Sequence, residues 1–183
     1  MTCRTVRQLL FIALVVVVVA SALRRGDERP GRGGRHEGVA RVVRVVDGDT
    51  IAVRLDGRGE RVRYIGVDTP ESVKPGSPVE CFAHAASAAN ARLVAGRRVR
   101  LVLDREPRDR YGRLLAYVYR VADGRFVNAE LVRRGYAHTL TIPPNDRFAT
   151  RFEALQARAQ HDARGLWRSC PLLAERYAEP PSS

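Results

Sequence analysis

Short runs of alternating apolar and polar residues, separated by turn signals, dominate the middle of the chain. Residues 39–46 are rich in β-branched side chains, residues 51–55 alternate strictly, and residues 61–67 follow a second Asp-Gly turn. Apolar residues alternate again within 99–103 and 114–121. A period of two, bounded by glycine and aspartate turns, is typical of β-strands. The pattern therefore predicts five short strands.

Three other segments have a helical pattern. Residues 83–95 are rich in alanine and stop at Gly96, and residues 129–134 follow Asn128, a residue type that caps helices. A last helix is predicted from apolar residues spaced along one face and ends at Gly165: Phe148, Phe152, Leu155 and Ala159. Together the elements predict an α+β, mainly β fold, a five-stranded OB-fold barrel with about three helices. Spacing alone also fits other α+β folds.

The first 22 residues have the pattern of a secretory signal peptide. A basic start precedes the apolar run 9–20, and Ala20-Ser21-Ala22 offers a small-residue cleavage site. The alternative is an uncleaved membrane anchor through residues 9–23, although a spanning helix needs about 20 apolar residues. Either way we expect the remaining chain to lie outside the cytoplasm, secreted or held at the outer face of the cell membrane. Residues 23–38 are predicted to be a flexible basic linker, 39–172 the folded domain and 173–183 a flexible tail.

The charge of the chain is strongly positive. Its 32 Lys and Arg residues exceed its 20 Asp and Glu residues by 12, and its pI is about 10.8. Such an excess indicates a polyanionic partner, either nucleic acid or an anionic membrane face. Lys74 is the only lysine, so a general preference for arginine is the alternative explanation. Charge alone favours nucleic acid and leaves the decision to the motifs.

The chain has three cysteines, Cys3, Cys81 and Cys170. Removal of the first 22 residues leaves a pair, which outside the cytoplasm is most simply a disulfide between Cys81 and Cys170. Two buried free thiols are the alternative. The three positions lack the clustered spacing of a zinc site.

Four acidic residues lie in two predicted turns: Asp47 and Asp49 in the first, Asp68 and Glu71 in the second. A hard cation such as calcium binds several oxygen atoms, which carboxylates and open turn carbonyls supply. Aspartates in turns also commonly cap their own backbone, and we prefer that explanation for Asp47. Asp49 and Asp68 are the better candidates for metal ligands.

Arginines with a possible role in phosphate binding occur at two places. Arg63 lies in a predicted strand, where its side chain either extends to water or points into a site that needs a bidentate cation. Arg110 and Arg113 flank Tyr111, and arginine suits phosphate oxygens while tyrosine can stack on a base. A polar hairpin loop is the simpler interpretation of this stretch. The four scattered histidines are interpreted as surface or core residues.

Five segments occur in a distinctive order: VVDGDTIAV (45–53), VRYIGVDTPE (62–71), DRYGRLLAYVY (109–119), VNAELVRRGYA (127–137) and ARGLW (163–167). Together they resemble the staphylococcal nuclease (thermonuclease) family from about residue 39 to residue 167. The fold of that family is an OB barrel with helices, and its activity is calcium-dependent hydrolysis of DNA and RNA that leaves 3′-phosphates. The resemblance implies an endonuclease of this kind that uses Ca²⁺ and acts on DNA and/or RNA. No protein partner is implied, and we expect a monomer.

The resemblance also implies roles for individual residues. Asp49 and Asp68 correspond to calcium carboxylates, with the carbonyl of Thr69 beside them. Glu71 corresponds to the acid that orients or deprotonates the attacking water. The scissile phosphate is held by two arginines, which correspond to Arg63 and Arg113, and the nucleotide pocket includes Tyr111 and Arg110.

One stretch departs from the family pattern. The tyrosine pair that follows the Gly-x-Ala segment in such proteins is absent, and residues 138–144 are HTLTIPP instead. We therefore expect a different nucleotide pocket and a different base preference. An alternative function is a nucleic-acid-binding barrel without catalysis, but such modules lose the acids or arginines that are all present here. A membrane-tethered scaffold, the third alternative, rests only on the N-terminal apolar run.

Overall fold

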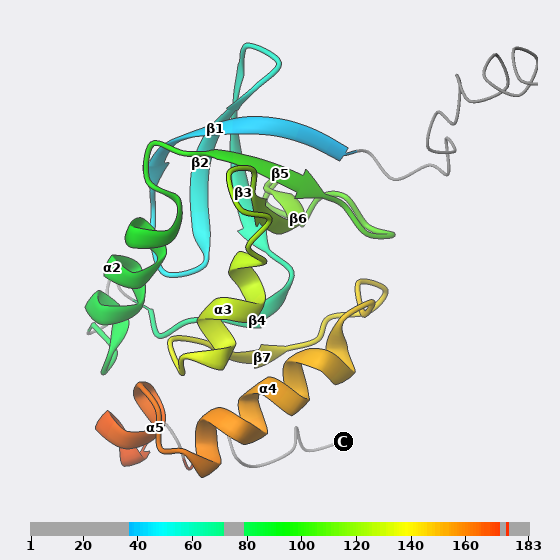
Figure 1. Ribbon diagram of the computed structural model, residues 1–183. Coiled ribbons are helices and arrows are strands. Elements are labelled where there is room, and N and C mark those ends of the chain that lie inside the picture. The colour runs from blue at the N-terminus through cyan, green and yellow to red at the C-terminus, as the bar shows by residue number, and fades with distance from the viewer. Residues whose placement is uncertain (1–36, 72–78, 173–174, 176–183) are drawn as a thin grey trace, which may run out of the picture. The chain divides into compact units, whose positions relative to one another are not determined.

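A computed structural model describes residues 37–71, 79–172 and 175 of this chain (Figure 1). The predicted signal peptide or anchor, the linker up to residue 36, and all of the predicted tail except Glu175 lie outside the described residues. Among the described residues, no helix combines the length and the apolar character needed to cross a membrane.

Five strands form a closed barrel in the order β1-β2-β3-β6-β5. Their bounds are β1 Glu37–Val45, β2 Thr50–Leu55, β3 Arg58–Tyr64, β5 Arg98–Val102 and β6 Leu114–Arg120. The predicted five-stranded OB-fold barrel is therefore confirmed. The first strand begins two residues earlier than expected, so residues 37 and 38 belong to β1 and not to the linker.

One pair of barrel strands, β3 and β6, runs parallel, whereas the other neighbouring pairs are antiparallel. Arg63 lies opposite Leu115 in this pair. Because parallel strands need a crossover connection, the chain between them builds α2 (Ala83–Val94) and β5 before it returns. The pairing places the end of β3 beside the segment that precedes β6, where Arg113 lies.

The single strand predicted over 61–67 is divided in two. The chain leaves the barrel at the end of β3, and β4 (Gly66–Asp68) pairs with β7 (His138–Leu140) in a separate two-stranded sheet. Gly66 has a φ of 78°, a conformation that glycine adopts without strain. A Cβ at this position would meet the ring of Phe152 at 2.4 Å. Gly66 therefore redirects the chain and carries Asp68 out of the barrel.

The helices cover one end of the barrel. The segments predicted to be helical correspond to α2, α3 (Val127–Arg133) and α4 (Ala149–His161). A further short helix, α5 (Leu166–Ser169), follows α4. Figure 1 shows α3 between the barrel and α4. The structure also joins Cys81, before α2, to Cys170, after α5, with a Cα–Cα distance of 6.0 Å. The predicted cysteine pair is thus present in the structure.

Asn128 does not cap α3, so that prediction is wrong. The helix begins at Val127, and the Asn128 side chain is fully buried within its first turn. Its amide oxygen accepts a hydrogen bond from the Val118 N–H at 2.9 Å, and its nitrogen donates to the Ile65 carbonyl at 2.9 Å. The side chain therefore joins α3 to β6 and to the turn before β4. Because these partners are distant in sequence, the local pattern could not reveal this role.

The hydrophobic core fills the barrel and continues under the helices. Alternate residues of the strands point into it, and aromatic side chains close it at the helical end. Its largest fully buried side chains include Ile51, Leu101, Tyr64, Tyr117, Leu131 and Phe152. The turns at the ends of these strands carry the polar residues that the sequence singled out.

Candidate active site

Asp49 lies in the turn between β1 and β2, and only 4% of its surface is exposed. One carboxylate oxygen, Oδ2, accepts hydrogen bonds from the backbone N–H and the hydroxyl of Thr69, at 2.9 and 3.0 Å. The other, Oδ1, accepts from the hydroxyl of Thr50 at 3.0 Å. These contacts fix the orientation of the carboxylate and bring together two turns that are far apart in sequence.

Arg63 connects Asp49 with Asp68. Its Nε lies 3.2 Å from Asp49 Oδ1, and its Nη2 pairs with Asp68 Oδ1. Its Nη1 donates to the carbonyls of Tyr64 and Val67, at 2.9 and 2.6 Å. Of the two roles considered for Arg63, the structure therefore favours a fixed cation in a polar site over a side chain that extends to water.

The pKa values of two aspartates are raised in this cluster. Burial raises the pKa of Asp68 to about 6, although Arg63 opposes the shift, and the negative charge of Asp49 adds to it. Burial and the charge of Asp49 likewise raise the pKa of Asp47 to about 6. Both carboxylates are therefore less readily ionised here than in water, mainly because they are buried, and a bound cation would stabilise their ionised form.

His138 also lies beside this cluster, a position that its neighbours in sequence did not predict. Its Nε2 is 3.5 Å from Asp68 Oδ2, because β7 pairs with β4. Burial lowers its pKa to about 4, so the ring is neutral at pH 7. It contributes no positive charge to the cluster at that pH.

The donor atoms around Asp49 and Asp68 fit a hard cation. Within residues 37–71 and 79–172, no group of three or more His, Cys, Asp or Glu side chains is arranged to hold a metal. Asp49 and Asp68 offer two carboxylates, and Thr69 follows directly with its carbonyl. These three oxygen donors suit calcium or magnesium, which take several water ligands, while His138 Nε2, 3.5 Å from Asp68 Oδ2, adds a nitrogen atom beside them.

Glu71 lies at the edge of this cluster. Its backbone N–H donates to Glu80 Oε2 at 2.9 Å, and its carbonyl accepts from the Glu80 N–H at 2.9 Å. The charges of Glu71 and Glu80 both contribute to the raised pKa of Asp68, which places Glu71 near that carboxylate. Asp49 from the first turn, and Asp68 and Glu71 from the second, therefore lie in one region.

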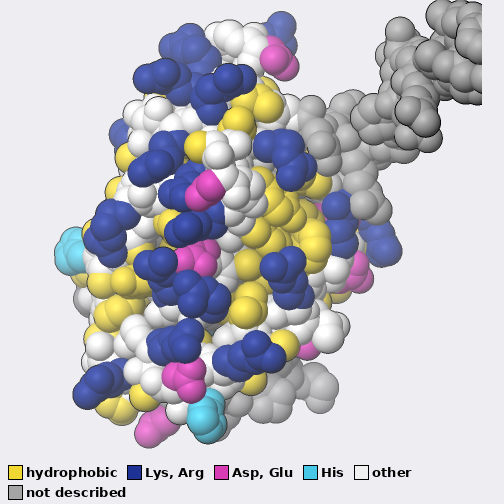
Figure 2. Space-filling model, viewed as in Figure 1, with side chains coloured by type: hydrophobic (Ala, Val, Ile, Leu, Met, Phe, Trp, Pro, Cys, Tyr) yellow, Lys and Arg dark blue, Asp and Glu magenta, His cyan; other side chains and the backbone are white. Residues whose placement is uncertain are grey.

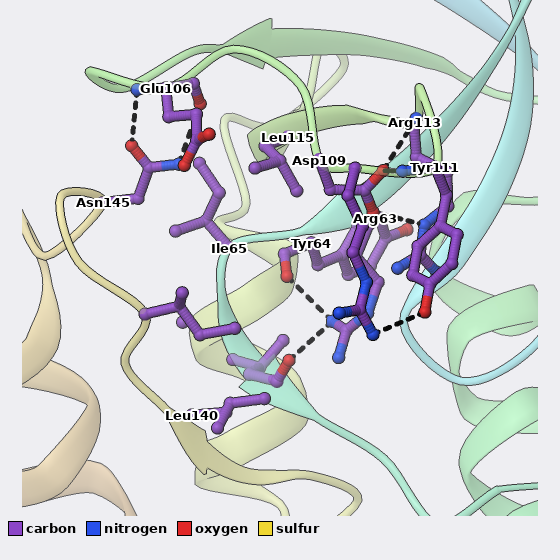
Figure 3. Close-up of a pocket in the computed structure, with 14 residues that line it drawn as sticks. Arg63, Tyr64, Ile65, Glu106, Asp109, Tyr111, Arg113, Leu115, Leu140 and Asn145 are labelled. Carbon is purple, nitrogen blue, oxygen red and sulfur yellow. Dashed lines mark hydrogen bonds and ion pairs between the residues drawn. The ribbon is translucent and has the colours of Figure 1, made fainter.

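A pocket of about 510 Å³ adjoins the cluster (Figure 3). Arg63 lines it from β3, and Tyr111, Arg110 and Arg113 line it from the loop before β6. The parallel pairing of β3 with β6 brings these segments together. The structure thus brings together the candidate phosphate-binding arginines and the candidate nucleotide-binding residues, and Arg63 links them to the candidate metal ligands.

Asp109 positions Arg113, a role that the sequence did not suggest. Its Oδ2 accepts from Arg113 Nε at 2.6 Å, and its Oδ1 accepts from the backbone N–H groups of Tyr111 and Arg113, both at 2.9 Å. The ring of Tyr111 is 68% exposed, and the guanidinium of Arg110 lies 4.8 Å from its centre. The turn therefore presents an aromatic face and two cations at the mouth of the pocket.

Asn90 supports the first acidic turn from behind, and sequence reasoning missed it. This fully buried side chain donates to the Asp47 carbonyl at 3.0 Å and accepts from the Tyr64 hydroxyl at 2.9 Å. The available signal was an asparagine on the buried face of an alanine-rich helix. Such a side chain must find polar partners, because an unpaired buried amide is costly.

The stretch that departs from the family pattern forms an apolar wall. Leu140 and Ile142 line the pocket together with Ile65 and Leu115. Ile142 is 61% exposed at the pocket rim. Branched aliphatic side chains therefore form this side of the pocket, in the stretch where the family pattern has a tyrosine pair.

Comparison with known proteins adds a family and named relatives. The family model described as "Staphylococcal nuclease homologue" matches residues 61–169. The thermonuclease of Staphylococcus intermedius is 42% identical over 161 residues, which cover 86% of this chain and 94% of that protein. The thermonuclease of Staphylococcus hyicus is 36% identical, with 86% of this chain and 95% of that protein covered. Endonuclease YncB of Bacillus subtilis is 38% identical over 73% of this chain and 63% of its own length.

Proposed function

The chain belongs to the staphylococcal nuclease family and is a nuclease, and we propose that it cleaves DNA and/or RNA with calcium and leaves 3′-phosphate ends. The observation that carries the proposal is the position of Arg63. This residue contacts Asp49 and Asp68 and also lines the pocket that contains Arg113. Candidate metal ligands and candidate phosphate ligands therefore meet at one side chain.

The two arginines are proposed to hold the scissile phosphate. Attack on a phosphodiester adds negative charge to the phosphoryl oxygens, and fixed cations stabilise that charge where it develops. The planar guanidinium matches two phosphate oxygens at once. Asp109 holds Arg113 in place, and the carbonyls of Tyr64 and Val67 hold Arg63. Both donors are thus oriented before a substrate binds.

Asp49, Asp68 and the Thr69 carbonyl are proposed to hold the calcium ion. A bound calcium ion supplies further positive charge to the phosphoryl oxygens. The same carboxylate oxygens contact Arg63 in the described structure, so a bound cation competes with its guanidinium for them. Glu71, near Asp68, is proposed to orient the attacking water and to accept its proton.

Tyr111 and Arg110 are proposed to contact the nucleotide beside the cleaved bond. A tyrosine ring stacks on any base, and an adjacent guanidinium favours the neighbouring phosphate. The apolar wall of Leu140 and Ile142 supports a base preference that differs from the one set by a tyrosine pair. The protein is proposed to act as a monomer.

The N-terminal 22 residues are proposed to direct export, with residues 23–36 as a linker to the nuclease domain. The support is the basic start, the apolar run and the cleavage pattern in the sequence. Secretion is the proposed outcome, and anchoring to the outer face of the membrane is the alternative. The intact mass of the protein recovered outside cells distinguishes the two, because only cleavage removes residues 1–22.

The metal assignment is tested with a series of rates against pH in calcium, in magnesium and in EDTA. We expect no turnover in EDTA, full turnover in calcium, and little in magnesium, which demands tighter octahedral geometry. The rate should rise toward alkaline pH, because the attacking water must lose a proton. Asp49→Asn should reduce the rate by about 10²-fold or more, the scale for the loss of one electrostatic contact in the transition state.

Asp56→Asn is the matched control, since Asp56 lies in the exposed β2–β3 turn and the substitution removes the same charge. Its rate should equal that of the wild type. Full activity in EDTA, or an Asp49→Asn variant as active as Asp56→Asn, would reject the metal site.

A further inference from the structure

The outer face of the barrel carries a second group of arginines, remote in sequence from the loop before β6. Arg41 on β1 lies directly opposite Arg54 on β2 and directly opposite Arg98 on β5. Residues directly opposite each other in antiparallel strands point to the same side of the sheet. All three side chains are exposed. They therefore form a row of like charges across three neighbouring strands.

Two more arginines extend this row. Arg44 and Arg61 both lie opposite Ala52, which is two residues from Arg54 and so on the same side of β2. Both are exposed. We call the set of Arg41, Arg44, Arg54, Arg61 and Arg98 the arginine face. In Figure 2, dark-blue side chains are spread over the visible face, and several of them lie at the top, where Figure 1 places the hairpin of β2 and β3.

The arginine face is not balanced by acids, whereas several arginines elsewhere pair with carboxylates. None of its members forms an ion pair with a described carboxylate. By contrast, Arg120 pairs with Asp123, and Arg133 and Arg134 both pair with Glu130. Exposed arginines without an ion pair to a described carboxylate also occur on α2, α4 and α5, at Arg92, Arg158 and Arg168, but these lie on separate helices and form no row. Like charges placed directly opposite each other destabilise a sheet, so their presence indicates an anionic partner.

The arginine face leads to the pocket along β3. Arg61 and Arg63 are two residues apart in this strand, so both point to its outer side, about 7 Å apart along the chain. Arg63 lines the pocket, while none of the five face residues does. A path of guanidinium groups therefore runs from the pocket onto β3, β2, β1 and β5.

We propose that the arginine face binds the phosphate backbone of a nucleic-acid strand whose cleaved bond lies in the pocket. The proposal rests on the nuclease function and not on the choice of metal. A phosphodiester polymer offers a regular row of anions, and guanidinium forks bind phosphate oxygens bidentately. The enzyme thus holds a polymer at several phosphates on one side of the cleaved bond, and a substrate shorter than the path leaves this surface empty.

The test compares two triple variants with the same loss of charge. R41Q/R54Q/R98Q removes the central row of the arginine face. R92Q/R158Q/R168Q removes three exposed arginines from α2, α4 and α5. Binding of a fluorescein-labelled single-stranded oligonucleotide is followed by anisotropy in EDTA, over about 50 to 200 mM salt. Because cleavage plays no part, the result is independent of whether the proposed metal mechanism is correct.

For R41Q/R54Q/R98Q, we expect a plot of the logarithm of the association constant against the logarithm of the salt concentration to have a slope that is shallower by about 2. This is roughly 0.7 for each of the three lost phosphate contacts. Affinity at low salt should fall by about tenfold or more, and the control should keep nearly the wild-type slope. With a long DNA as substrate, kcat/KM should fall by a factor similar to the loss of affinity. On a mononucleotide p-nitrophenyl phosphodiester, it should not change.

Equal slopes for the two triple variants would overturn the proposal, because the effect would then follow net charge alone. So would loss of binding to phosphatidylserine vesicles with an unchanged oligonucleotide slope, which would make the face a membrane surface. Thermal unfolding controls for misfolding, and the removal of mutual repulsion should leave stability equal or higher. R44Q/R61Q provides a second pair of positions for the same measurement.

Discussion

Replacement of Asn128 by alanine tests how the fold supports the candidate site. The change leaves the Val118 N–H and the Ile65 carbonyl without their partner, and both lie in the buried interior. Each unsatisfied buried group costs about 1–3 kcal/mol, so the free energy of unfolding should fall by about 2–6 kcal/mol. That is a large part of the roughly 5–15 kcal/mol of a typical domain.

Urea unfolding followed by circular dichroism measures this loss. The slope m, by which the free energy of unfolding falls with urea concentration, is fitted as one shared value for all variants. Asn145→Ala is the matched comparison. The Asn145 side chain also makes two hydrogen bonds to backbone groups, the N–H and carbonyl of Glu106, each at 2.8 Å. Glu106 is exposed, so water can replace both bonds, and the cost should stay near 1 kcal/mol. An Asn128→Ala variant that loses no more than Asn145→Ala would refute the reasoning.

Three further predictions concern the site and the disulfide. Arg63→Lys should lose about 10²-fold or more in turnover, because a lysine cannot reproduce the bidentate fork, while its thermal unfolding stays cooperative. Near-wild-type turnover in a folded variant would show that Arg63 does not bind the phosphate. Reduction of the Cys81–Cys170 bridge, whose partners are 89 residues apart, should lower stability by up to about 4–5 kcal/mol, and thiol titration of the denatured, unreduced protein should find neither cysteine free. The pKa values of Asp47 and Asp68 are raised from 3.8 to about 6, so the folded state binds these two protons more tightly than the unfolded state does. The protonated carboxyls therefore stabilise the metal-free protein below about pH 4, and this contribution to the free energy of unfolding should be lost as pH rises from about 4 to 6. Asp47→Asn should therefore be more stable than the wild type at pH 7 but not at pH 4, as measured by urea unfolding in EDTA. An equal difference in stability at both pH values would contradict the raised pKa of Asp47.

The elements that the sequence predicted well are those whose pattern is local. Strict alternation in residues 51–55 predicted β2, and the alanine-rich run before Gly96 predicted α2. The strand over 61–67 was predicted as one piece because both halves have the same polarity pattern. The break depends on the positive φ of Gly66 and on its contact with Phe152, which is distant in sequence.

The same distinction applies to the candidate site. Asp49, Asp68 and Arg63 could be named because they lie in short motifs next to turn residues. Asn90 and Asp109 could not, because their effect is to hold other residues in place through contacts that only the folded chain makes. A supporting side chain has no motif of its own, and its polar character is the only hint.

The parallel pairing of β3 with β6 has a consequence for the timing of synthesis. A ribosome delivers β1 to β4 first, with Arg63 and both candidate metal carboxylates. Until residues 114–116 have also emerged, β3 lacks its neighbour in the barrel, and the pocket lacks the wall that carries Arg113. Cys170, which closes the covalent ring, comes later still. A growing chain therefore carries the parts of a nuclease without an assembled site, and nucleic acid near the ribosome meets the complete pocket only when translation is well advanced.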